Sequence, residues 1–345
     1  EEFLAGNNGI FSTRLVEELK DCLDDDKQAM LFLNRRGYST FVSCRACGKV
    51  VSCPSCDISM TYHKAENRMR CHFCGASLPV PRLCPACHKP FVKYFGVGTE
   101  QVEEQLRELF PAVKTLRMDT DTMRQKGRMQ EHLQAFAAGE AQVLIGTQMI
   151  AKGHDFPEVT LVGVISADAA LRIPDYRSSE RCFQLLTQVS GRAGRDKSPG
   201  RVIVQTYSPG HPAIRFAKEH DYKRFFAYEL AERRKGVFPP YSLFIRVLFV
   251  GTDEAMLASQ TRSFAEGLES ALQKSLGEEG KKALLLYCAS EAPIRRLQGQ
   301  YRYQVLIKLL RTKETPEAIR TVYDFADHHR NDLFALVEVN PQDML

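Results

Sequence analysis

The chain has 345 residues, of which 44% are hydrophobic and 26% are charged, and its formal net charge is +5. These values are typical of a soluble globular protein with two or three domains. No apolar run approaches the length of a transmembrane helix, so no membrane span is expected. Eleven cysteines and no visible signal peptide favour metal binding over disulfides, and they predict a reducing, cytoplasmic compartment.

The first 210 residues predict strands that alternate with helices. In chain order we expect a helix at 12–26, strands at 29–33 and 91–95, a helix at 100–110, a strand at 113–118, a helix at 129–138, strands at 142–145 and 159–165, a helix at 179–189 and a strand at 201–207. This alternation indicates a parallel, two-sided α/β sheet. A cysteine-rich segment interrupts the pattern, so we interpret it as an insertion.

The remaining residues predict a second type of fold. A charged helical segment at 211–236 ends before two prolines. After it we expect a strand at 243–250, a helix at 253–277, strands at 283–288 and 301–310, a helix at 315–329 and a strand at 333–339. The order β-α-β-β-α-β is that of a ferredoxin-like α+β domain. The predicted domains are an α/β domain at 1–43 and 94–210, an inserted module at 44–93, a helical linker at 211–240 and a C-terminal domain at 241–345.

Eight cysteines form four Cys-x-x-Cys pairs, which can supply two tetrahedral all-sulfur zinc sites. The pairs are Cys44 with Cys47, Cys53 with Cys56, Cys71 with Cys74, and Cys84 with Cys87. Four pairs combine into two sites in three ways. The first two pairs are too close for one site, whereas the middle two have nearly the spacing of a zinc ribbon. We therefore favour a nested arrangement, with the two middle pairs on one structural Zn²⁺ and the two outer pairs on the other.

Two further segments carry candidate chemistry. In Gln188-Val-Ser-Gly-Arg192-Ala-Gly-Arg195 the two arginines are three residues apart, so a helix would present both on one face to a triphosphate. The alternative is a glycine-rich turn with solvated arginines. Upstream, residues 145–157 follow a predicted strand, and the carboxyl ends of parallel strands are where α/β sheets bind ligands. Together the two segments resemble motifs V and VI of a superfamily 2 helicase.

The whole set of motifs resembles one family, the PriA primosomal replication-restart helicases. The resembling segments are 31–38, the four cysteine pairs, 96–100, 117–121, 146–157 and 188–195. The resemblance implies a RecA-like second motor lobe in a DNA-dependent ATPase that moves 3′ to 5′ and recognises stalled forks. It also implies ATP with Mg²⁺, branched and single-stranded DNA, single-stranded DNA-binding protein and primosome components as ligands and partners, no membrane, and the nested zinc pairing.

The resemblance also assigns roles to individual residues. Arg192 and Arg195 would contact the ATP phosphates, and Gln188, Gly153 and Asp155 would line the nucleotide cleft. Thr147 and Lys152 would link closure of that cleft to single-strand phosphates, and Arg35 and Arg36 would touch DNA. Each of these residues has an alternative role in supporting the fold.

One departure from the family pattern limits the expected activity. The chain has no Gly-x4-Gly-Lys-[Ser/Thr] phosphate loop, and Asp253-Glu254-Ala255 comes after motif VI, where the family order does not place a Walker B sequence. We therefore interpret the chain as the carboxyl-terminal half, unable to hydrolyse ATP alone. The alternative is a non-catalytic zinc-ribbon DNA-binding or assembly protein with a vestigial motor lobe. Another superfamily 2 translocase is a third possibility, against which the inserted cysteine pairs argue.

The C-terminal domain has a candidate DNA-binding hairpin around Gly299. Its basic and aromatic residues are Arg295, Arg296, Tyr301, Arg302 and Tyr303. Such a hairpin can bind phosphates and stack bases. The alternative is a solvated hairpin with cross-strand tyrosines.

Overall fold

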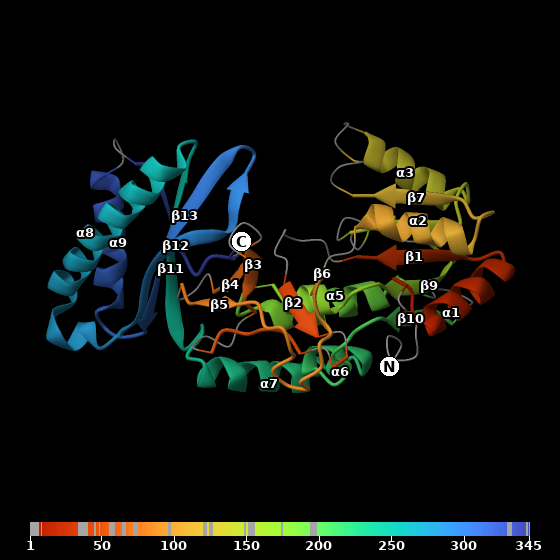
Figure 1. Ribbon diagram of the computed structural model, residues 1–345, viewed down its shortest axis with the longest axis horizontal. Coiled ribbons are helices and arrows are strands. Elements are labelled where there is room, and N and C mark those ends of the chain that lie inside the picture. The colour runs from red at the N-terminus through yellow and green to blue at the C-terminus, as the bar shows by residue number, and fades with distance from the viewer. Residues whose placement is uncertain are drawn as a thin grey trace.

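The computed structural model is elongated, with an α/β lobe at one end and an α+β domain at the other (Figure 1). It describes residues 7, 9–33, 41–44, 46–47, 49–54, 59–63, 67–71, 75–95, 98–119, 123, 127–147, 150, 156–173, 175–193, 199–329, 333–342 and 344. Within this part of the chain, no helix is long and apolar enough to cross a membrane.

The lobe is built on a five-stranded sheet in which every strand is parallel to its neighbours. The order is β10-β9-β1-β8-β7. The strands are β1 (Gln28–Phe32), β7 (Thr115–Met118), β8 (Val143–Gly146), β9 (Val159–Val164) and β10 (Arg201–Val204). The parallel sheet predicted from the alternating pattern is therefore confirmed.

Helices cover both faces of this sheet, so all five residues of β1 are buried. Ala29 and Leu31 point into a core with α1 and α2, whereas Met30 and Phe32 point into a core with α3, α5 and α6. The helices of the lobe are α1 (Thr13–Asp24), α2 (Thr99–Leu109), α3 (Arg128–Ala137), α4 (Asp168–Leu171) and α5 (Ser178–Ser190). A continuous apolar strand is what a sheet with two covered faces requires.

The inserted module leaves and re-enters the lobe through two adjacent strands. β2 (Phe41–Cys44) pairs antiparallel with β6 (Val92–Phe95). β6 corresponds to the strand that we expected at 91–95, but it belongs to this two-stranded stem and not to the sheet of the lobe. The rest of the module holds β3 (Thr61–His63), β4 (Arg68–Arg70) and β5 (Ser77–Pro79), which form a three-stranded sheet.

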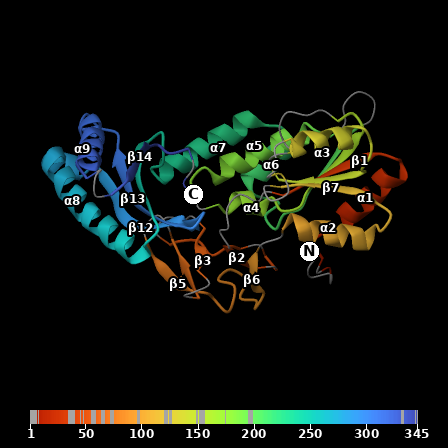
Figure 2. The same ribbon diagram turned by 90° about the horizontal axis from the view of Figure 1, so that it is seen from above.

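The segment expected as one helical stretch at 211–236 is two helices. α6 (Pro212–Lys218) ends before His220, whose φ of 52° is left-handed. α7 (Tyr222–Lys235) then begins with Asp221 as its cap, because the Asp221 carboxylate accepts a hydrogen bond from the Arg224 amide at 2.9 Å. The chain therefore turns between two helices that lie beside α5 (Figure 2).

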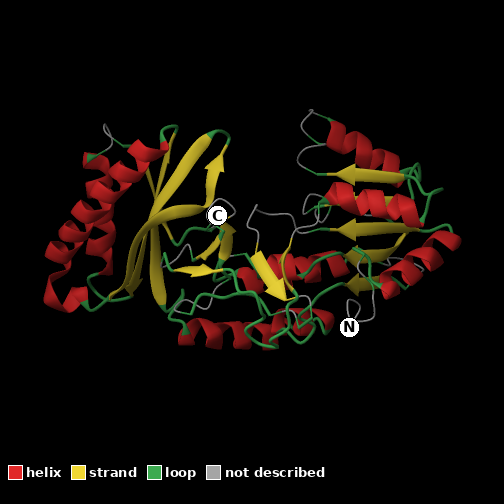
Figure 3. Cartoon of the chain, in the orientation of Figure 1, coloured by secondary structure: helices red, strands yellow, loops and turns green. Residues whose placement is uncertain are grey.

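The C-terminal domain has the predicted ferredoxin-like order. Its elements are β11 (Ser242–Gly251), α8 (Glu254–Lys281), β12 (Leu284–Leu297), β13 (Gln300–Leu310), α9 (Thr315–His328) and β14 (Ala335–Val339). The antiparallel sheet has the order β12-β13-β11-β14 (Figure 3). β12 extends well beyond the predicted strand at 283–288 because it forms a long hairpin with β13. Both turn residues, Gln298 and Gly299, have positive φ, as a tight hairpin turn requires.

The two faces of the C-terminal sheet have different neighbours. Alternate residues of β11, such as Val247 and Phe249, pack against α8 and α9. Phe244 and Leu306 lie in another core with Met60 and Met69 of the cysteine-rich module. An ion pair joins the same two parts, with Arg70 Nη1 3.3 Å from the Glu291 carboxylate. The module is therefore held between the lobe and the C-terminal sheet.

We predict that Phe249→Ala destabilises the C-terminal domain by about 3–5 kcal/mol, because Phe249 is fully buried and its ring meets the Phe264 ring edge-on at 5.0 Å. Phe226→Ala is the matched control, since 51% of Phe226 is exposed and its loss should cost less than about 1 kcal/mol. Urea unfolding of both variants measures the difference. Equal costs would contradict the assignment of Phe249 to this core.

Candidate functional site

The outer two cysteine pairs form a compact thiol cluster. The Sγ atoms of Cys44, Cys47, Cys84 and Cys87 all lie within 4.8 Å of one another. β2 ends at Cys44, and its pairing with β6 brings the far end of the module back beside it. Four sulfurs at this separation suit a tetrahedral zinc ion with no open position, which is a structural site. The grouping is the outer half of the nested arrangement that the spacing favoured.

The backbone around these cysteines is shaped to hold a metal. The Cys44 amide donates to the Lys49 carbonyl at 2.9 Å, and the Cys84 amide donates to the Lys89 carbonyl at 3.0 Å. The two turns thus have the same five-residue offset. At the second turn the His88 amide also donates to the Cys84 carbonyl at 2.9 Å, and His88 has a left-handed φ of 56°. Equivalent turns allow two pairs to approach one ion from opposite sides.

The thiols of this cluster differ in how readily they lose a proton. Desolvation raises the pKa of Cys44, and desolvation together with hydrogen bonds to the neighbouring thiols raises the pKa of Cys47 to about 12. Desolvation also acts to raise the pKa of Cys84, but hydrogen bonds from the backbone amides of Cys87 and Ala86 and from the thiols of Cys47 and Cys87 outweigh it and lower that pKa to about 7. Cys84 is therefore the member of the cluster most readily available as a thiolate, the form that binds metal.

The inner cysteine group is described in part. Cys53 and Cys71 are each only 1% exposed, whereas Cys56 and Cys74 lie outside the described residues. The turn after Cys71 repeats the pattern of the outer pairs, because the Cys71 amide donates to the Ala76 carbonyl at 2.9 Å and Gly75 has a left-handed φ of 75°. A second metal at this group remains a proposal.

The three isolated cysteines, Cys22, Cys182 and Cys288, are expected from the sequence to be small buried hydrophobic residues. Cys22 and Cys182 are buried, and burial raises the pKa of both thiols, that of Cys182 to about 12. Cys288 is only half-buried, which corrects the expectation. Its sulfur lies on β12 beside Gly75, where the C-terminal sheet meets the module.

Two of the predicted nucleotide-binding residues, Gln188 and Arg192, lie at the end of α5. Gln188 is exposed in the last turn of the helix, and Arg192 is half-buried just beyond it. The Arg192 amide donates to the Val189 carbonyl at 3.0 Å, so the backbone of Arg192 is fixed to the helix. Arg195 lies outside the described residues.

One of the other predicted motor residues, Thr147, lies at the carboxyl edge of the sheet. Thr147 follows β8 directly, and its amide is 3.4 Å from the Met118 carbonyl of the neighbouring strand β7. The edge is tightly built, since a Cβ atom on Gly146 would come within 2.8 Å of that same carbonyl. The remaining predicted residues lie outside the described part of the chain: Arg35, Arg36, Lys152, Gly153 and Asp155.

The basic and aromatic side chains of the expected hairpin lie on two faces of the sheet. Tyr301 and Tyr303 are half-buried and pack against the core under α8 and α9. Arg302 lies between them and so points to the opposite face. Arg295 forms an ion pair with Glu254 at the start of α8. The guanidinium of Arg296 lies 5.1 Å from the centre of the Tyr301 ring. DNA binding by this hairpin stays a prediction, with the basic and aromatic side chains on different faces of the strand.

Comparisons with known proteins agree on one family. Residues 53–79 match the model described as "PriA DNA helicase Cys-rich region (CRR) domain", and residues 91–197 match the "Helicase conserved C-terminal domain". Replication restart protein PriA of Bacillus subtilis is 44% identical over 350 aligned residues, which cover 100% of this chain and 42% of that protein. The chain belongs to the PriA family.

Two other PriA proteins give the same result. The Synechocystis protein is 44% identical and aligns with 89% of this chain and 36% of its own length. The Treponema pallidum protein is 39% identical and aligns with 97% of this chain and 50% of its own length. The chain therefore spans half or less of the length of these PriA relatives. The matched region includes the lobe, the module and the C-terminal domain.

Sequence reasoning missed a set of residues at the other end of α5 in this PriA-family chain. The ring of Tyr176 stacks between those of Phe238 and Phe244, with centroid separations of 5.4 and 5.7 Å. Arg177, next to it, donates to the Pro341 carbonyl at 2.5 Å. The partner lies 164 residues away in sequence, so no local pattern signals the contact.

We predict that Cys84→Ser removes about one zinc ion per chain, because it deletes one of four ligands and the thiol with the lowered pKa. Cys182→Ser is the matched control, since this buried thiol lies in the core of the lobe and should leave the zinc content unchanged. Metal analysis of the purified variants measures both. Full zinc content in Cys84→Ser would exclude this cluster as a zinc site.

Proposed function

We propose that this chain is the carboxyl-terminal half of an ATP-dependent DNA helicase that moves 3′ to 5′, recognises stalled replication forks and starts primosome assembly. The observation that carries the proposal is the end of α5. There, Gln188 lies in the last turn of the helix and Arg192 directly follows it, inside the segment that matches the helicase C-terminal domain. The relatives from Bacillus subtilis and Synechocystis are replication restart proteins, which supports the cellular role.

In this proposal ATP and Mg²⁺ bind between a first lobe and the lobe described here. Arg192 and Arg195 hold the phosphates, and their fixed positive charge offsets the negative charge that develops on the transferred phosphoryl group. Gln188, Gly153 and Asp155 line the cleft on this side. Thr147 and Lys152 contact single-strand phosphates at the carboxyl edge of the sheet, beside Arg35 and Arg36.

The zinc module acts as a rigid DNA-binding attachment to the lobe. Lys49 and Lys89 follow the two metal-binding turns and are both exposed. Because the turns are equivalent and hold one cluster, the proposal places both lysines where they can contact the phosphates of one DNA strand. Arg68 and Arg70 have structural contacts instead, since Arg70 pairs with Glu291 of the C-terminal domain and Arg68 Nε donates to the Ser77 hydroxyl at 2.8 Å.

We predict that the chain alone binds forked DNA but shows no DNA-stimulated ATP hydrolysis, because one lobe supplies only half of the nucleotide cleft. In a protein that also carries the first lobe, Arg195→Ala or Arg192→Ala should lower kcat by about 10³-fold. Arg224→Ala on α7 is the control, since that side chain pairs with Asp221 and Glu219. Unchanged ATP turnover in Arg195→Ala would favour a vestigial lobe in a non-catalytic DNA-binding protein.

We predict that replacing Lys49 and Lys89 by alanine reduces the slope of log affinity against log salt by about two for forked DNA, one unit for each lost phosphate contact. Lys235→Ala is the control, because Lys235 Nζ lies 2.5 Å from the Glu232 carboxylate on α7. Fluorescence anisotropy at several salt concentrations measures the slopes. If the double variant keeps the original slope, the module does not contact DNA through these turns.

A further inference from the structure

The two ends of α5 have different surroundings, and a single helix joins them. The helix has 13 residues and is therefore about 20 Å long. Its last turn carries Gln188, and the Arg192 amide is bonded to it. Its first turns are held by residues from outside the lobe. The positions Arg181, Gln184 and Gln188 lie three and four residues apart, so they follow one face of the helix.

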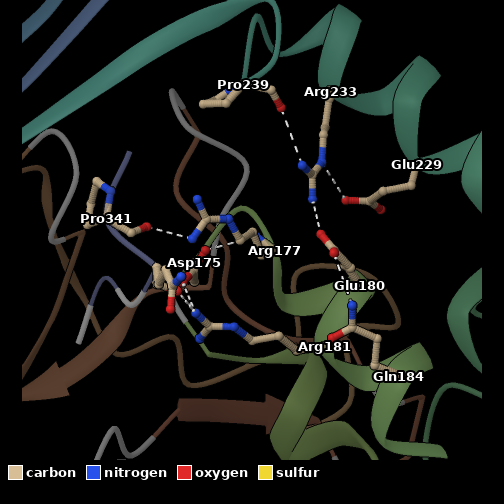
Figure 4. A network of polar contacts seen from close by, with 10 residues as sticks. Asp175, Arg177, Glu180, Arg181, Gln184, Glu229, Arg233, Pro239 and Pro341 are labelled. Carbon is tan, nitrogen blue, oxygen red and sulfur yellow. Dashed lines mark hydrogen bonds and ion pairs between the residues drawn. The ribbon is translucent and has the colours of Figure 1, made fainter. Parts of the chain in front are cut away.

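The first turns of α5 are bound to the very end of the chain. Arg177 donates to the Pro341 carbonyl at 2.5 Å, and Arg181 donates to the Gln342 carbonyl. Arg181 also lies 3.1 Å from the carboxylate of Asp175, which is almost fully buried (Figure 4). Two arginines on the same side of one helix thus donate hydrogen bonds to consecutive carbonyl groups of one short segment.

A third arginine connects the same helix end to α7. Arg233 Nη2 lies 2.6 Å from the Glu180 carboxylate, and Arg233 Nε lies 3.1 Å from the Glu229 carboxylate. Arg233 Nη1 donates to the Pro239 carbonyl at 3.3 Å, where the chain enters the C-terminal domain (Figure 4). The Arg233 side chain is only 15% exposed, so this charge has little access to water and depends on these partners.

Residues 340–342 and 344 are themselves fixed to the C-terminal domain. The Asn340 amide donates to the Phe244 carbonyl at 2.7 Å, and the Asn340 side-chain oxygen accepts from the Phe244 amide at 3.0 Å. Met344 is 1% exposed and belongs to the core that also holds Tyr176 and Met69. The segment therefore has the C-terminal sheet on one side and the start of α5 on the other.

We propose that residues 340–342 and 344 form a positioning segment for α5, and that Arg177 and Arg181 are positioning residues through which the C-terminal domain sets the placement of Gln188 and Arg192. The proposed roles of Gln188 and Arg192 in binding nucleotide are part of the proposed function, so this inference rests on it. A packed helix is a stiff connection, and a shift at its first turn is passed to its last. The alternative is a purely structural attachment, a staple, which fastens the C-terminal domain to the lobe and has no effect on Gln188 and Arg192.

Hydrogen–deuterium exchange on the chain itself tests the positioning. Removing residues 341–345, or making Arg181→Gln, should increase the exchange rates of the amides at 186–192 at least ten-fold. Arg181→Lys should give a smaller increase, because an ammonium keeps the charge but cannot reproduce the guanidinium's two fixed contacts. Arg224→Gln, outside the junction, should change nothing there. Faster exchange confined to 176–182 would overturn the proposal in favour of the staple.

Kinetics in a protein with both motor lobes provide the second readout. There, loss of residues 341–345 should lower kcat for DNA-stimulated ATP hydrolysis at least ten-fold, while the affinity for forked DNA stays within two-fold. An unchanged kcat with intact DNA binding would overturn the positioning role. If the unaltered two-lobe protein does not hydrolyse ATP, the proposed function fails, and the exchange experiment still decides whether the segment positions α5.

Discussion

The junction around Tyr176 is the contact on which the arrangement of the molecule depends. Its ring lies between Phe238 of the linker and Phe244 of the C-terminal sheet, with the guanidiniums of Arg177 and Arg233 within about 5 Å of the ring centre. Burial raises the pKa of the Tyr176 hydroxyl, so it stays protonated and uncharged throughout the physiological range. Because the lobe, the linker, the module and the C-terminal domain all contribute to this core, their relative placement is set at one point.

Local patterns predicted most of the elements, because each lies in a run with a clear period or a continuous apolar stretch. They could not show what each strand pairs with. The strand at 91–95 has the same composition as a strand of the parallel sheet, yet its partner is Phe41–Cys44 of the stem. Similarly, we did not predict from the residues at 219–221 that one helix ends before the left-handed His220 and that the next helix begins with Asp221 as its cap.

For the candidate site, too, local patterns predicted some contacts and could not predict those between residues far apart in the sequence. Cysteine spacing predicted which pairs meet, because ligand geometry limits the possible combinations, and the outer cluster agrees with it. At the hairpin, neighbouring residues in a strand point to opposite faces, so Tyr301 and Arg302 lie on different faces, as the sequence pattern alone implies. DNA binding by the hairpin stays a prediction. The arginine contacts at the start of α5 were out of reach, because their partners are carbonyl groups more than 160 residues away.

The two-stranded stem has a consequence for the motor lobe. Strands paired in a sheet lie about 5 Å apart, so the two ends of the insertion leave the lobe side by side. The stem therefore closes the insertion in the way that a short loop would, although the insertion has about fifty residues. The parallel sheet does not bear the entropic cost of holding the two ends of the insertion together. Loss of metal would thus disturb the core around Tyr176 before it reached β1 or β8. The module is connected to the sheet through the stem, whereas it shares a packed core with Tyr176 at the start of α5.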